Sequence, residues 1–116
     1  MKASLINRSK NLVLVDAVED AKSLWSRMRG LLGRANLPAD QALWISPCNS
    51  IHTFFMKFTI DAVFVDDQFV VRKVVRGVRP WRLVPPVWQA RSVFELAEGQ
   101  ASMDRVTEGD QLHVGH

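Results

Sequence analysis

Two apolar runs separated by a short polar loop constrain the fold more than any other feature of this sequence. Ala62–Val65 and Phe69–Val75 are rich in β-branched and aromatic residues, and only Asp66, Asp67 and Gln68 lie between them. Runs of this length and composition are typical of strands, and a short polar loop between them is typical of a hairpin. The sequence therefore predicts an antiparallel hairpin over these residues.

Four further segments have the composition of short strands, and turn-forming residues separate them. They are Asn11–Val15, Ala42–Ile45, Ser92–Ala97 and Gln111–Val114. The segment Arg79–Trp88 contains three prolines, so we predict an edge strand or a crossing loop there rather than a central strand. Many short strands with turns between them favour a β-barrel or a β-sandwich.

One helix is expected after the first strand. Asp16 followed by Glu19 resembles a capping box. Apolar residues then recur at spacings of three and four, at Ala17, Ala21, Leu24, Met28 and Leu31. We expect a helix from Asp16 to about Leu32, ended by Gly33 or earlier by Gly30, and a short helical turn over Ala101–Val106. The predicted fold class is mainly β, or α+β by content, with the N-terminal helix outside the strands or across one end.

The composition is that of one globular domain, predicted to span residues 1–116. Apolar residues make up 47% and charged residues 23%, which argues against a disordered chain. The single cysteine excludes an internal disulfide and fits a reducing compartment. No apolar run is long enough for a signal peptide or a membrane-spanning helix. We therefore expect a soluble, cytoplasmic, monomeric protein with no membrane association.

Positive charge is concentrated in one part of the chain. The net charge is only +3, but residues 68–94 contain no acidic side chain. The basic residues there are Arg72, Lys73, Arg76, Arg79, Arg82 and Arg91. Such a segment can attract anionic partners, although an ordinary solvated strand face has the same appearance. Nucleic-acid-binding domains usually carry more charge, so nucleic acid is the less favoured partner.

The stretch Ile51–Val65 alternates between apolar and polar positions. In a strand, alternate residues point to opposite faces. The even-numbered positions from His52 to Phe64 are apolar after the histidine, and the odd-numbered positions include Thr53, Lys57, Thr59 and Asp61. Strands commonly run about 5 to 6 residues, so we expect a bend or break near Lys57–Ile60.

Cys48 and His52 are the candidate catalytic pair. A histidine that takes the thiol proton would activate the sulfur as a nucleophile. Four residues of extended strand cover about 13 Å, so the pair meets only if Pro47–Ser50 turns back on itself. The alternative is that Cys48 packs as a small apolar side chain and that His52 is a hydrogen-bonded histidine at the edge of the core.

No metal or cofactor is predicted. The cysteine and histidine donors are Cys48, His52, His113 and His116, and no pair of them has a compact metal-binding spacing. Structural zinc needs four such ligands and catalytic zinc about three.

Five segments, taken in order, resemble the domain-of-unknown-function 192 family. They are Met28–Arg34, Ser50–Asp66, Val78–Arg82, Phe94–Gly99 and Glu108–Val114. The resemblance runs over about Val15 to Val114. It implies a compact, mainly β domain with a short helix, and no established reaction.

Polar residues within these segments define a candidate ligand-binding cleft. Its predicted members are Thr53, Lys57, Asp61, Arg82 and Glu95. A carboxylate between apolar neighbours, such as Asp61, needs a partner, and Arg82 or Lys57 would supply an ion pair. If Asp61 and Glu95 converge, one of them becomes a candidate general acid or base.

Trp81 and Trp88 lie on either side of the double proline. They would offer either an aromatic platform for a ligand or a seal at one end of the fold. The sealing role is favoured, because tryptophan is well buried on average.

Three functions follow from these observations. The first is a binding or accessory module with a polar cleft for a small anionic ligand or a peptide. The second is a small hydrolase or transferase that uses Cys48 and His52. The third is weak nucleic-acid binding through residues 68–94. Whether the protein is an enzyme stays open on the sequence alone.

Overall fold

In a computed structural model, residues 3–21, 37–54 and 56–115 are described, and within them the regular structure consists of strands alone. The strands are β1 (Ser4–Asn7), β2 (Leu12–Val15), β3 (Ala17–Ala21), β4 (Gln41–Ile45), β5 (Ile51–His52), β6 (Ile60–Val65), β7 (Val71–Val78), β8 (Leu83–Val84), β9 (Ser92–Ala97) and β10 (Leu112–Gly115).

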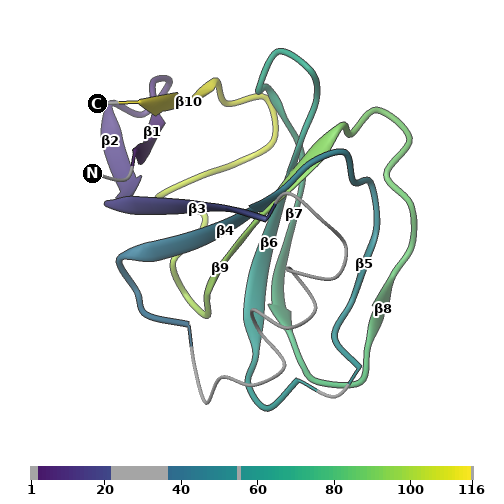
Figure 1. The fold of residues 1–116 in the computed structure, drawn as a ribbon. Coiled ribbons are helices and arrows are strands. Elements are labelled where there is room, and N and C mark those ends of the chain that lie inside the picture. Colours follow the sequence, from purple (N-terminus) through teal and green to yellow (C-terminus); the bar gives the residue numbers. More distant parts are fainter. Residues whose placement is uncertain (1–2, 22–36, 55, 116) are drawn as a thin grey trace.

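A five-stranded sheet in the order β3-β4-β9-β6-β7 forms the middle of the molecule. β3 runs parallel to β4, and the other neighbours are antiparallel. The other sheets of the described residues are a three-stranded sheet, β10-β1-β2, and the pair β5-β8. In Figure 1 these two smaller sheets appear on opposite sides of the five-stranded sheet.

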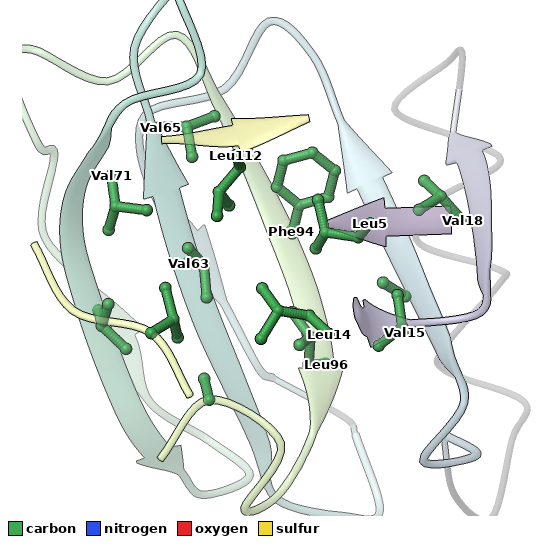
Figure 2. Packing of buried hydrophobic residues seen from close by; sticks show 14 residues of the cluster. Leu5, Leu14, Val15, Val18, Val63, Val65, Val71, Phe94, Leu96 and Leu112 are labelled. Carbon is green, nitrogen blue, oxygen red and sulfur yellow. The ribbon is translucent and has the colours of Figure 1, made fainter. Parts of the chain in front are cut away.

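All six residues of β6 are buried, because both faces of its sheet are covered. Since side chains alternate along a strand, Val63 and Val65 join one apolar cluster, and Ala62 and Phe64 join the other. The first cluster contains residues of β1, β2 and β10, and the second contains residues of β5 and β8. Figure 2 shows the first cluster, to which Leu5 of β1 and Phe94 of β9 both belong. The five-stranded sheet therefore separates two cores.

The predicted N-terminal helix is wrong where the structure describes it. Ala17–Ala21 forms β3 and pairs with Gln41–Ile45 of β4. The amides of Asp16 and Ala17 both donate to the Asp40 carbonyl, at 3.0 Å each. Pairing with a distant strand therefore replaces the local helix that the capping pattern indicated. The rest of the predicted helix, through Leu32 and its Gly33 cap, lies outside the described residues.

The predicted helical turn is also wrong, and so is the barrel, one of the two predicted alternatives beside the β-sandwich. Over Ala101–Val106 the chain forms turns, in which the amides of Arg105 and Val106 both donate to the Ser102 carbonyl. In the described part of the chain, the end strands β3 and β7 do not pair with each other, so the five-stranded sheet stays open.

The remaining strand predictions are confirmed. β6 and β7 form the predicted antiparallel hairpin, with Val65 opposite Val71. β2, β4, β9 and β10 lie at the predicted positions, and Arg79–Trp88 contains only the two-residue strand β8. The expected break near Lys57–Ile60 separates β5 from β6. β1 was not predicted. No helix that is long and apolar enough to cross a membrane occurs in the described residues.

Candidate functional site

Asp61 is a buried carboxylate whose partners are backbone amides. The residue is 1% exposed. Oδ1 accepts a hydrogen bond from the Gly77 amide at 2.9 Å, and Oδ2 accepts from the amides of Gly99 and Ala101 at 3.0 Å each. Three N–H donors compensate for the removal of this charge from water. Asp61 therefore ties β7 and the loop after β9 to β6.

The predicted ion pair of Asp61 with Arg82 or Lys57 is wrong. Both carboxylate oxygens are occupied by the backbone, and both basic side chains are exposed. Asp61 is therefore placed as a structural group, without a basic partner in the described part of the chain.

Asp61 and Glu95 lie on opposite faces of the five-stranded sheet. Asp61 is opposite Leu96 in the β6–β9 register, and Glu95 is opposite Ala62. Residues opposite each other in a sheet share a face, and neighbours along a strand do not. Asp61 therefore points to the side of Leu96 and the first cluster, and Glu95 points to the side of Ala62 and the second. The arrangement does not bring the two carboxylates together.

Cys48 and His52 have different surroundings. The partly buried Cys48 packs against the second cluster, and its thiol donates to the Ser50 carbonyl at 2.8 Å. His52 is exposed on β5, and its Nδ1 accepts from the Phe54 amide at 3.4 Å. Within the described residues, no hydrogen bond joins the thiol to the imidazole. Ile51, which precedes His52, points inward instead.

Thr53 is fully buried and holds the turn Arg79–Arg82, which leads from β7 to β8. Its Oγ1 donates to the Arg79 carbonyl and accepts from the Arg82 amide at 2.9 Å. Its amide donates to the Arg82 carbonyl at 2.9 Å, and its carbonyl accepts from the Trp81 amide at 3.0 Å. The polar groups of one residue thus fix both ends of the Arg79–Arg82 turn.

A groove of about 350 Å³ lies beside this turn. We call it the arginine groove. Its lining consists of Val75, Arg76, Gly77, Val78, Arg79, Arg82, Leu83 and Val84. The lining contains three guanidinium groups and no carboxylate, so an anion entering it meets only positive charge.

The three arginines of the groove differ in what they already bind. Arg76 donates to the carbonyls of Ala101 and Val106, at 2.6 and 2.9 Å. Arg79 and Arg82 are exposed, and in the described part of the chain neither forms an ion pair. Arg79 and Arg82 therefore keep guanidinium donors for a ligand, whereas the Arg76 guanidinium holds the Ala101–Val106 segment against β7.

An exposed apolar surface adjoins the groove on the outer side of β5 and β8. We call it the Trp81 surface, and it consists of His52, Phe54, Trp81 and Leu83. His52 is opposite Leu83 in the β5–β8 pair. The ring centroids of His52 and Phe54 lie 5.1 Å apart, and those of Phe54 and Trp81 lie 6.0 Å apart at an interplanar angle of 27°. Three rings thus follow one another across the surface.

The predicted sealing role of the two tryptophans is wrong. Trp81 is 56% exposed and Trp88 is 86% exposed, so neither closes the end of the core. The sequence also predicted that the even-numbered positions of Ile51–Val65 form a buried face. This is wrong before the break, because His52 and Phe54 are exposed and Thr53 is buried.

The structure thus divides the predicted binding residues into two groups. Thr53 contacts Arg82, and Lys57 is exposed at the same end of the sheet, where Ile60 of β6 lies opposite Val78. Asp61 and Glu95 are buried within the sheet instead.

Two residues of this region were missed as site residues, Arg79 and Phe54. The acid-free composition of residues 68–94 was the signal for Arg79.

One carboxylate away from the groove has a lowered pKa. Burial alone raises the pKa of Asp66, but hydrogen bonds from the amides of Val70 and Gln68 and the nearby Arg72 guanidinium lower it by more. Asp66 thereby closes the β6–β7 hairpin and neutralises Arg72, whose Nη2 lies 2.9 Å from its Oδ2.

Within the described residues, no group of three or more Cys, His, Asp or Glu side chains lies close enough to hold a metal ion. Fold and surface together define a small, mainly β domain with an exposed arginine groove.

The chain belongs to the DUF192 family, described as "Uncharacterized ACR, COG1430", whose model matches residues 5–114. It is 33% identical over 113 residues to the UPF0127 protein PH1112 of Pyrococcus horikoshii, covering 93% of this chain and 96% of that protein. A crystal structure of a protein of unknown function from Novosphingobium aromaticivorans has a TM-score of 0.79 at 18% identity, covering 96% of this chain and 82% of that one. A putative transcription regulator from Sinorhizobium meliloti also has a TM-score of 0.79, at 19% identity, covering 97% and 91%. These similarities establish the family and the fold, and the family is uncharacterised.

Proposed function

We propose that this domain is a binding module that recognises an anionic group, a carboxylate or a phosphate, in the arginine groove. Arg79 and Arg82 supply the charge, and Thr53 holds the turn from which both side chains extend. Lys57, at the same end of the sheet, adds a further positive charge.

One observation carries this proposal: two exposed guanidinium groups line a groove whose lining has no carboxylate. Surface arginines are commonly neutralised by nearby acids, as Arg72 is by Asp66. A guanidinium group presents several N–H donors in a planar fork that matches carboxylate and phosphate oxygens. The fixed backbone of the Arg79–Arg82 turn reduces the conformational entropy that a ligand must overcome.

The geometry gives less support to a hydrolase or transferase. A nucleophile needs its base within about 2.6–3.2 Å, although apo structures are often looser. The Cys48 thiol and the His52 imidazole each bond to a backbone group, and β5 directs Ile51 inward and His52 outward. The pairing would require the Cys48–His52 segment to rearrange.

The test titrates the protein with sodium tripolyphosphate and with citrate at low salt, and calorimetry measures the binding. We expect binding that weakens on the order of tenfold in Arg82→Ala and in Arg79→Ala, because each loses a charge-assisted contact. Lys73→Ala is the matched control. It also removes one exposed positive charge, but Lys73 lies on β7 and does not line the groove. Equal weakening in Lys73→Ala and Arg82→Ala would reduce the effect to overall charge and contradict a groove site.

A further inference from the structure

Trp81 has a backbone conformation that a tryptophan rarely adopts. Its φ is +64°, in the left-handed region that disfavours side chains with a Cβ. The hydrogen bonds of buried Thr53 to Arg79, Trp81 and Arg82 hold this conformation in place. Strain of this kind persists only where surrounding structure enforces it, and it is concentrated at functional sites. Here the enforced conformation leaves Trp81, with its large ring, 56% exposed.

The exposed ring belongs to a short stack. Phe54 lies between Trp81 and His52, with centroid separations of 6.0 and 5.1 Å and interplanar angles of 27° and 34°. Leu83, 67% exposed, adds apolar area beside them. Flat ligands stack on such aromatic faces, and every nucleic-acid base has a flat face.

Positive charge lies next to the stack. Arg82 directly follows Trp81 in the chain, and Arg79 lies two residues before it. Both line the arginine groove. A repeating ligand that alternates flat rings with anionic groups would contact the rings and the guanidinium groups together.

We infer that the Trp81 surface and the arginine groove together bind single-stranded nucleic acid. Bases stack on Trp81 and Phe54, and phosphates bind to Arg79 and Arg82. This inference rests on the proposed anion site and names its ligand class. A duplex is a poorer ligand, because its bases are stacked on one another and their faces are hidden. An acidic peptide matches the arginines but supplies no base for the stack.

The experiment measures fluorescence anisotropy of a labelled 12-nucleotide oligothymidylate and of a duplex of equal length, at 50 and 200 mM salt. We expect the single strand to bind more tightly than the duplex. With roughly two phosphate contacts, from Arg79 and Arg82, its affinity falls roughly sevenfold between the two salt concentrations.

The decisive variant is Trp81→Gly, which removes the ring and suits the positive φ, so the turn keeps its conformation. Trp81→Asn provides a second test, since asparagine also tolerates this region. Both variants should weaken single-strand binding on the order of tenfold, the loss expected for one stacked base. Trp88→Ala, which removes an exposed tryptophan outside the stack, and Lys73→Ala should stay within about twofold of the wild type.

The outcomes separate this inference from the proposed function. If Arg82→Ala loses tripolyphosphate but Trp81→Gly binds the oligonucleotide as the wild type does, the nucleic-acid inference is wrong and the anion site stands. If a glutamate-rich peptide binds and the oligonucleotide does not, the ligand is a peptide. If neither tripolyphosphate nor the oligonucleotide binds, both proposals fail.

Discussion

Asp61 and Thr53 are both buried polar residues that bond to the backbone of distant segments, but they serve different parts of the molecule. Asp61 holds Gly77 and Gly99, whose φ angles of +66° and +90° are ones that glycine tolerates. Thr53 holds a turn in which Trp81 has a similar φ of +64°.

The difference between the two regions lies in which residue occupies the left-handed position. At the Asp61 contacts, the residues with positive φ are glycines, so the backbone there is relaxed. At the Thr53 contacts, the residue with positive φ is Trp81. Its exposed ring adds little to the core, and its backbone is strained. Asp61 therefore stabilises the five-stranded sheet and the loop after β9, and Thr53 positions the Trp81 surface. Four experiments test these roles.

The largest effect is expected for Asp61→Asn. The amide has a single acceptor oxygen and turns an NH2 group toward backbone donors, so buried N–H groups lose their partners. We expect the free energy of unfolding to fall by about 3–5 kcal/mol, measured by urea denaturation. Asp67→Asn, in the exposed hairpin loop, is the control and should change little. A loss of less than about 1 kcal/mol in Asp61→Asn would show that the Asp61 hydrogen bonds are not important for the stability of the fold.

Thr53→Val should have a smaller effect on stability and a clear effect on binding. It keeps the shape but leaves the Arg82 amide and the Arg79 carbonyl without the hydroxyl, which costs about 1–3 kcal/mol. Tripolyphosphate affinity should fall as well, because the turn loses its support. Thr53→Ser, which restores the hydroxyl, should recover the affinity. A Thr53→Val protein that is destabilised but binds normally would leave Thr53 with a purely structural role.

A third and more modest effect should appear in acid. Burial alone raises the pKa of Asp110, but hydrogen bonds from Lys10, Asn7 and the Thr107 amide lower it by more. Because the folded-state pKa lies below the unfolded one, this stabilisation is complete above about pH 5 and is lost as the pH falls below about 4.

Urea midpoints measured between pH 7 and pH 2 should therefore decrease on the acid side, and less steeply in Asp110→Asn than in the wild type. The amide of the variant cannot titrate, so its contribution does not change with pH. Identical acid slopes for the two proteins would contradict the assignment to Asp110.

The smallest change in stability is expected for Trp81→Gly. Relief of the left-handed strain stabilises the variant by about 1 kcal/mol, and loss of the partly covered ring opposes this. The unfolding temperature should shift by only a few degrees, measured by calorimetry. A large loss of stability would mean that Trp81 belongs to the core rather than to the binding surface.

The strands that the sequence predicts correctly are those whose signal is local. β6, β7 and β9 have runs of β-branched and aromatic residues bounded by turn signals. β3 has a helix-like start at Asp16, and it becomes a strand because β4 offers a parallel partner more than twenty residues away. A single sequence carries no signal for that pairing.

The site was less predictable because its contacts are non-local. The Thr53 hydroxyl accepts a hydrogen bond from the amide of Arg82, 29 residues later in the chain. Asp61 accepts one from the amide of Gly99, 38 residues later. Alternation along a strand indicated that polar residues fall on one side of Ile51–Val65. It did not indicate that the break before β6 turns Thr53 inward, or that the β6–β9 register separates Asp61 from Glu95.

The position of β7 at the end of the five-stranded sheet has a consequence for contacts between copies of the protein. An end strand offers backbone groups to which a strand of another molecule can pair, which is a common route to aggregation. At the start of β7 the Val71 backbone already bonds to Gly109 and Asp110. Exposed Lys73 and Arg76 lie along the rest of the strand. Two such strands brought together would oppose the positive charges of Lys73 and Arg76, which disfavours edge-to-edge pairing.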